Sequence, residues 1–179
     1  SIPRLPIPQE LYYTLPMKHI LTSIFLIVFL FPSLASGEEV TFDELVYREG
    51  LFYKNSTDVL FTGKVTKGGQ QWTFKEGKAE GSYVSYHDNG ELSSKGIYKN
   101  GERDGPWVTY HMSGQLMTKE TLKNGERDGP WEYYFVNGRL REKGTYKNGK
   151  REGIWIDYNK NGTVNESLTG TYKNGVKVD

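Results

Sequence analysis

The sequence contains no cysteine among its 179 residues. This excludes disulfide bonds, thiol catalysis, cysteine-ligated zinc and a lipid anchor on cysteine. Export from the cell stays compatible with the composition, because disulfides are optional outside the cytoplasm. Without cross-links, the fold has to be stabilised by burial and strand pairing alone.

The sequence also has no excess of charge of either sign, with 23 basic and 22 acidic residues and a formal net charge of +1. Residues 1–37 hold two of the basic residues and one acidic residue, so the remaining chain carries 21 of each and has no net charge. Nucleic-acid binding depends on the neutralisation of phosphates, and anionic lipids attract basic clusters. We therefore expect no nucleic-acid partner and no strong electrostatic attraction to a membrane.

Long hydrophobic runs are scarce as well, and the most prominent one covers only residues 20–31. It follows the basic start Met17-Lys18-His19 and precedes the small residues Ala35 and Gly37. A membrane-spanning helix needs about 20 apolar residues, whereas a basic start, a short apolar core and a small-residue end are typical of a secretory signal. We predict cleavage after Gly37 or after Ala35, with retention as an uncleaved anchor as the alternative.

These observations predict four regions along the chain. Met17 has the position of an initiator, and residues 1–16 are predicted to be a mis-called upstream start. Residues 17–37 are the predicted signal peptide, residues 38–73 a degenerate N-terminal cap repeat, and residues 74–179 a repeat array that closes with a half-repeat. The predicted location is periplasmic or secreted.

Helical periodicity is missing after Gly37, and an internal repeat of 24 residues takes its place. Three series of glycines keep this step, as do two series of aromatic residues. The glycines are Gly77, Gly101, Gly125 and Gly149; Gly81, Gly105, Gly129 and Gly153; and Gly90, Gly114, Gly138 and Gly162. The aromatic residues are Tyr83, Trp107, Trp131 and Trp155, followed by Tyr86, Tyr110, Tyr134 and Tyr158.

Asn-Gly pairs separate short runs rich in Trp, Tyr, Val and Thr, which predicts a series of β-hairpins. In the second strand of each hairpin, alternation predicts that Leu92, Ser94, Gly96 and Tyr98 share one face. A glycine on that face lets an aromatic ring lie flat against the backbone. The predicted fold is all-β, an elongated antiparallel array of hairpins with like residues aligned as ladders across the sheet.

The repeated motif Tyr-Lys-Asn-Gly-x-x-x-Gly-x-Trp-x-x-Tyr-x-x-x-Gly-x-Leu resembles the bacterial MORN repeat variant found in YwqK-family antitoxins. The resemblance covers about Val46 to Gly175. It implies side-by-side hairpins and a role in protein binding, in scaffolding or at membranes, and the antitoxin label implies neutralisation of a toxin by binding. An export signal does not fit an antitoxin against a cytoplasmic toxin, but it fits a periplasmic immunity protein.

Two groups of repeated side chains are the candidate binding residues. A charged ridge formed by the turns contains Arg103, Arg127 and Arg151 beside repeated carboxylates. The aromatic rows consist of Trp107, Trp131 and Trp155 and of Tyr110, Tyr134 and Tyr158. Residues three apart in a strand point to opposite faces, so one row is predicted to be exposed as a binding anchor unless both pack inside a rolled sheet.

Catalytic, metal and cofactor motifs are not found. His87 and His111 lie 24 residues apart, and hairpins that repeat about every 10 Å place them too far apart to bind one ion directly. The turn carboxylates repeat in every unit, which suits a structural part better than one catalytic centre. We therefore predict a non-enzymatic module without a cofactor that binds a protein in the cell envelope or outside the cell. The alternative is a structural scaffold that binds a membrane or polysaccharide surface through its aromatic rows.

Overall fold

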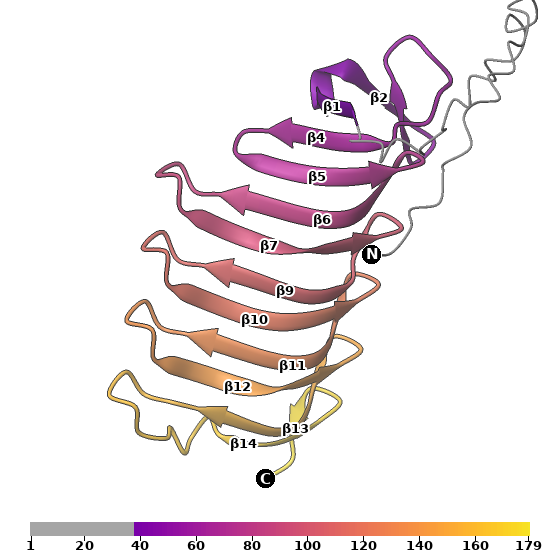
Figure 1. Cartoon of the computed structure of the whole chain (residues 1–179). Helices are drawn as coiled ribbons and strands as arrows, with labels where there is room; N and C mark the ends of the chain where they lie inside the picture. The colour runs from indigo at the N-terminus through magenta and orange to yellow at the C-terminus, as the bar shows by residue number, and fades with distance from the viewer. Residues whose placement is uncertain (1–37) are drawn as a thin grey trace, which may run out of the picture. The chain divides into compact units, whose positions relative to one another are not determined.

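The computed structural model describes residues 38–179 (Figure 1), and the predicted upstream segment and signal peptide lie outside the described residues. Apart from one 3-10 turn, η1 (Phe42–Glu44), every regular element in that range is a β-strand. The strands are β1 (Glu38–Thr41), β2 (Leu45–Arg48), β3 (Leu51–Lys54), β4 (Gly63–Lys67), β5 (Gln70–Lys75), β6 (Lys78–Tyr86), β7 (Leu92–Lys99), β8 (Glu102–Arg103), β9 (Gly105–Tyr110), β10 (Leu116–Lys123), β11 (Glu126–Tyr134), β12 (Leu140–Lys147), β13 (Lys150–Asp157), β14 (Gly170–Lys173) and β15 (Val176–Lys177).

Thirteen of these strands form one sheet whose spatial order follows the chain from β4 to β15, with β8 paired to β7. Neighbouring strands are antiparallel throughout, except that β1 pairs in parallel with β4 at the N-terminal edge. Figure 1 shows the successive hairpins stacked side by side along the sheet. The predicted all-β array of antiparallel hairpins is therefore confirmed.

Two kinds of turn alternate along the array. In the turns that join one unit to the next, both residues of the Asn-Gly pair have positive φ, as in Asn124 (49°) and Gly125 (79°), which matches a type I′ hairpin turn. In the turn within each unit only the glycine has positive φ. The first of these is closed by a 2.8 Å hydrogen bond from the Gly90 N–H to the His87 carbonyl. The Asn-Gly pairs therefore form hairpin turns of two kinds, with both residues at positive φ in four pairs and only the glycine in the pairs at Gly90, Gly138 and Gly162.

Each unit also contains two bulges at equivalent places. One contains the Asp-Gly or Glu-Gly pair: Glu120 faces Trp131, but Leu122 faces Arg127, so β11 carries two extra residues. The other lies beside the strand tyrosine: Ser85 pairs with Ser94, but Tyr86 pairs with Leu92. Bulges bend a strand and increase its local twist, and here they recur in every unit.

The second bulge corrects the predicted face of the leucines. Because Tyr86 and Ser85 point to opposite faces, their partners Leu92 and Ser94 do so as well. Simple alternation placed them on one face, and the extra residue Ser93 breaks that alternation. The same displacement occurs at Leu140 and Glu142, which pair with Tyr134 and Tyr133.

The N-terminal end of the sheet is closed by a cap with its own small core. Val40, Phe61, Val65 and Phe74 are buried there, and Phe61 and Val65 are 0% exposed. The hairpin of β2 and β3 and the turn η1 contribute partly buried apolar side chains around them. The predicted boundary between cap and repeats at residue 74 falls inside β5, so the cap and the repeats share one continuous sheet.

Candidate functional surfaces

The two faces of the sheet differ in how their side chains are covered. We call the face that carries Trp107, Trp131 and Trp155 the tryptophan face, and the opposite face, with Tyr86, Tyr110, Tyr134 and Tyr158, the tyrosine face. On the tryptophan face the three indole rings are 1%, 8% and 1% exposed. The two rows thus lie on opposite sides of the sheet, and their surroundings decide what each can contact.

Bare backbone beneath the rings explains the burial of the tryptophans. Gly96 pairs with Tyr83 and lies under Trp107, and a Cβ on it would come within 1.9 Å of the indole Cε3. A Cβ on Gly144 would lie 2.3 Å from Cδ2 of Trp155. The prediction that glycine lets a ring lie flat against the strand is confirmed at these two positions. The rings then meet Tyr98 and Tyr146 edge to face, with centroids 5.5 Å and 4.9 Å apart.

The three predicted arginines cover the outer side of the same rings. Their guanidinium carbons lie 4.4 Å (Arg103), 4.1 Å (Arg127) and 4.2 Å (Arg151) from the centroids of the tryptophans four residues ahead. Arg127 also bonds the Glu120 carboxylate at 2.7 Å, and Arg151 pairs with Glu142. The arginines are therefore engaged in intramolecular cation–π and ion-pair contacts.

This arrangement changes the roles of two predicted groups. The tryptophans are packed inside the ladder, so we no longer assign them to a contact surface. The arginines are partly exposed to solvent. Replacement of all three by alanine would remove the side chains that cover three buried indole rings. Loss of binding in such a variant would report on folding as much as on recognition.

The carboxylates of the turns link neighbouring units. Asp104 accepts a hydrogen bond from the Asn124 backbone N–H at 3.2 Å, and Glu152 accepts one from Asn174 at 2.9 Å. Backbone bonds run beside them, such as Gly125 N–H to the Arg103 carbonyl at 2.9 Å. These two acids hold their turns against the next turn along the array.

The histidines have a similar linking role. The Nε2 atom of His87 lies 3.0 Å from the Tyr110 carbonyl, and that of His111 lies 3.1 Å from the Tyr134 carbonyl. A carbonyl accepts but cannot donate, so each ring must carry its proton on Nε2. Among residues 38–179, no group of three or more histidines or acids is placed to hold a metal ion.

The tyrosine face contains a continuous cross-strand row that sequence reasoning did not single out. Its members are paired in register from one strand to the next. In order they are Gln71, Val84, Lys95, Val108, Lys119, Glu132, Lys143 and Ile156. The three lysines are exposed and repeat every 24 residues, a signal that was present in the sequence.

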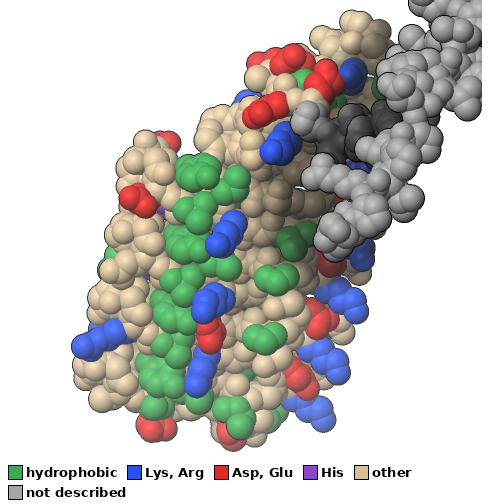
Figure 2. Space-filling model, viewed as in Figure 1, with side chains coloured by type: hydrophobic (Ala, Val, Ile, Leu, Met, Phe, Trp, Pro, Cys, Tyr) green, Lys and Arg blue, Asp and Glu red, His purple; other side chains and the backbone are tan. Residues whose placement is uncertain are grey.

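The tyrosines and leucines form a second row beside it. Tyr110 pairs with Leu116 and Tyr134 with Leu140, at the ends of the strands. Figure 2 shows hydrophobic side chains in a column across the strands, next to a line of basic side chains with one acidic interruption. The strand register gives the order of the charged residues in the row as Lys95, Lys119, Glu132 and Lys143.

Glu132 interrupts the lysines and bonds the neighbouring tyrosine. The Tyr134 hydroxyl donates to the Glu132 carboxylate at 2.6 Å. Partial burial, this hydrogen bond and the adjacent negative charge raise the pKa of Tyr134 to about 12. The phenol is therefore protonated, and it is a hydrogen-bond donor engaged by its own strand.

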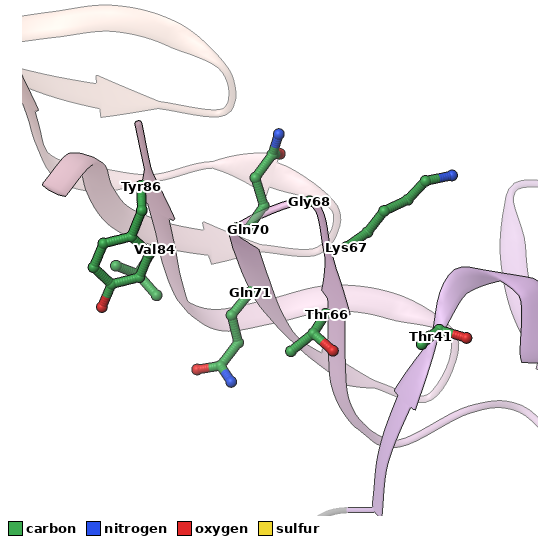
Figure 3. Close-up of a pocket in the computed structure, with 9 residues that line it drawn as sticks. Thr41, Thr66, Lys67, Gly68, Gln70, Gln71, Val84 and Tyr86 are labelled. Carbon is green, nitrogen blue, oxygen red and sulfur yellow. The ribbon is translucent and has the colours of Figure 1, made fainter. Parts of the chain in front are cut away.

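At the N-terminal end, the tyrosine face continues into a shallow hollow of about 510 Å³. Figure 3 shows Val84 and Tyr86 beside Gln71 and Thr66, while Lys67 extends away. Tyr86 is 49% exposed, more than the later members of its row. The hollow therefore extends the apolar column up to the cap.

Within residues 38–179, no helix has the length and apolar character needed to cross a membrane. Together, fold and surfaces define an open array of β-hairpin repeats with buried tryptophans on one face and an uncovered row of side chains on the other. Two segments, residues 79–100 and 127–148, match the family model described as MORN repeat variant. Their starts lie 48 residues apart, twice the repeat length. No curated protein matches the chain. Repeats of this kind are in general modules that bind proteins or membranes.

Proposed function

We propose that this chain is a non-enzymatic repeat module that binds a protein partner through its tyrosine face. The observation that carries the proposal is the in-register row of Val84, Lys95, Val108, Lys119, Lys143 and Ile156 beside the tyrosine row. An apolar column of this kind, rimmed by charge and left uncovered, is typical of an interaction site. Asp104 and Glu152 bond the backbone of neighbouring turns, and the three arginines contact the tryptophans, which supports a structural role for these groups.

The chemistry of the face indicates the kind of partner. Tyrosine supplies contact area at low entropic cost and is enriched among binding anchors. The lysines repeat once per hairpin, about 10 Å apart, and Glu132 is the single acid in their line. A partner with apolar side chains and acidic groups at that spacing complements the face.

The cellular setting of the proposal comes from the sequence. The predicted signal over residues 17–37 favours a periplasmic or secreted location. The repeat motif resembles YwqK-family antitoxins of bacteria, so we propose an immunity-like role in which the module neutralises a toxin by binding it.

The alternative is a scaffold on a membrane or polysaccharide surface. It draws on the same face, since tyrosines beside lysines suit the interface of an anionic bilayer. The predicted neutrality of the chain weakens long-range attraction, which is why we favour a protein partner.

A charge-reversal pair tests the proposal. The protein and two triple variants are used to capture partners from envelope and secreted fractions, with mass spectrometry as the readout. Lys95, Lys119 and Lys143 become Glu in the test variant. Lys99, Lys123 and Lys147, which have the same spacing at the exposed turn edge, become Glu in the control.

A stoichiometric protein that is lost with the test variant and kept by the control supports the proposal. Retention by the test variant contradicts it. Vesicles containing phosphatidylglycerol form a separate arm: vesicle binding lost in the test variant, without a captured protein, supports the scaffold alternative.

A further inference from the structure

A third cross-strand row, on the tryptophan face, is regular in the first units and changes in the last two. The row starts with hydroxyl pairs that bond across neighbouring strands. Ser85 and Ser94 are joined at 2.7 Å, and Thr109 and Thr118 at 2.6 Å. Ser85 and Thr118 are buried. In these units, small side chains that hydrogen-bond to each other thus close the surface beside the tryptophans.

Larger and charged residues continue the row. Thr118 faces Tyr133, Tyr133 faces Glu142, and Glu142 faces Asp157. A cleft of about 410 Å³ opens at this place, lined mainly by Trp131, Tyr133, Arg141, Glu142, Arg151 and Asp157. Leu168 lines it as well, from the segment after β13 that carries the two-residue insertion in the repeat. Departure from a repeat pattern at one place is where a functional site is expected.

The polar groups of the cleft fall into an engaged set and a free set. Glu142 accepts from Arg151 and, at 3.4 Å, from the Trp131 indole N–H. The Asp157 carboxylate receives no hydrogen bond from any residue in the range 38–179. Arg141 is the extra residue of the bulge, and its guanidinium carbon lies 5.0 Å from the Tyr133 ring centroid and 5.6 Å from that of Phe135. These are cation–π contacts, and its N–H groups have no carboxylate partner among the described residues. The cleft therefore offers one free acceptor and one free donor group around aromatic side chains.

The charge balance of the cleft selects against ions. Two arginines and two carboxylates leave no net charge, so neither an anion nor a cation is favoured. Arg141 and Leu168 are exposed, and in such an open site charge pairing contributes only about 0–1 kcal/mol. Recognition then depends on hydrogen-bond geometry and on contact with aromatic rings, which a neutral ligand with many hydroxyls provides.

We propose that this cleft binds one neutral saccharide residue. Asp157 accepts from ligand hydroxyls, Arg141 donates to them, and the C–H face of the sugar packs against the partly buried Tyr133 and the exposed Leu168. The site lies on the face opposite to the proposed protein-binding surface, so it stands independently of that function.

The test uses the methyl glycosides of glucose, galactose, mannose and N-acetylglucosamine, titrated into the protein and followed by ¹H–¹⁵N NMR. We expect saturable shifts at the amides of Tyr133, Arg141, Glu142 and Asp157 with at least one glycoside. Asp157→Asn and Arg141→Met each remove a hydrogen-bonding charge, and each should weaken binding about tenfold.

Two comparisons make the result decisive. Methionine is the residue at the equivalent place one unit earlier, Met117, so Arg141→Met keeps a side chain that the repeat accommodates. Lys99→Met, at an exposed turn edge away from the cleft, is the control and should leave saccharide binding unchanged. The absence of shifts with all four glycosides overturns the proposal, as do shifts that map to the tyrosine face, or saturable binding of zwitterionic glycine in their place.

Discussion

At the scale of single residues, the fold depends on positions where a side chain is missing. Gly96 and Gly144 provide the space in which Trp107 and Trp155 lie, and the arginines then cover those rings. Trp155 adds a hydrogen bond from its indole N–H to the Thr145 carbonyl at 3.2 Å. A single substitution is therefore expected to lower stability most where the new side chain occupies that space.

The substitution Gly144→Ala tests this at one position. Its Cβ would overlap the Trp155 ring, so the indole or the strand has to shift, and overpacking of this kind costs about 1–3 kcal/mol. Thermal unfolding by circular dichroism measures the loss. Ile97→Ala is the control, since Ile97 is 46% exposed and its change should stay within about 0.5 kcal/mol. Equal effects of the two substitutions would contradict the steric account.

The Tyr134 hydroxyl gives a residue-scale prediction on pH. The pKa of Tyr134 is raised from 10.0 to about 12 by partial burial, the hydrogen bond to Glu132 and its charge. A raised pKa means that the fold favours the protonated phenol, so this contribution is complete below pH 10 and is lost as the pH rises towards 12. Titration of ¹³Cζ-labelled tyrosine by NMR should show this late transition.

Replacement of Glu132 by glutamine should lower the pKa of Tyr134 towards, but not down to, its ordinary value, because partial burial remains. Glu126→Gln, at an exposed turn, is the matched control and should leave the Tyr134 transition in place. An unchanged transition in Glu132→Gln would contradict the assigned cause.

At the scale of strands, the aromatic ladder is interrupted at β10. Where other units have Gly and Tyr, this strand has Glu120 and Leu122. Tyr98 contacts Trp107, and Tyr146 contacts both Trp131 and Trp155, but no aromatic pair of the described residues joins Trp107 to Trp131. The ladder thus forms two blocks, which meet at an ion pair between Glu120 and Arg127 and at the buried Leu122.

Restoring the repeat at β10 should strengthen this junction. The double substitution Glu120→Gly with Leu122→Tyr is expected to raise stability by about 1 kcal/mol, since edge-to-face aromatic pairs contribute roughly 0.5–1.5 kcal/mol. The midpoint of thermal unfolding is the measurement. Tyr146→Leu makes the opposite change in the next unit and should lower that midpoint. A double variant less stable than the parent protein would show that the interruption is already optimal.

At the scale of the described chain, each hairpin relies on its neighbours, and the ends need protection. Repeat arrays of this kind are stabilised by interfaces between adjacent units and require caps. The N-terminal end has a compact core and the short strand β1, whereas the C-terminal end finishes with β15, only two residues long. Short edge strands limit pairing with other chains.

Removal of the cap core should therefore affect association as well as stability. Phe61 is 0% exposed, and Phe61→Ala should cost about 3–5 kcal/mol within the cap. Loosening of the cap uncovers the edge of β4, so light scattering after size exclusion should show concentration-dependent association. Val176→Ala, at the other end and 66% exposed, should remain like the parent protein. A monomeric Phe61→Ala variant would contradict a protective role for the cap.

The sequence by itself determined the period, the all-β class, the hairpins and the glycines at Gly96 and Gly144 that leave room for a ring, because glycine and Asn-Gly pairs act locally on the backbone. Only the tertiary structure decided which row is buried. Bulges at Ser93 and its equivalents move the leucines to the tyrosine face, and long arginines fold back over the tryptophans. It also aligned the lysines in one row on the tyrosine face, and it brought together the residues of the cleft at Asp157 on the tryptophan face. Cross-strand register creates these neighbours, and a shift of one residue exchanges the two faces, so a pattern read along one strand does not contain them.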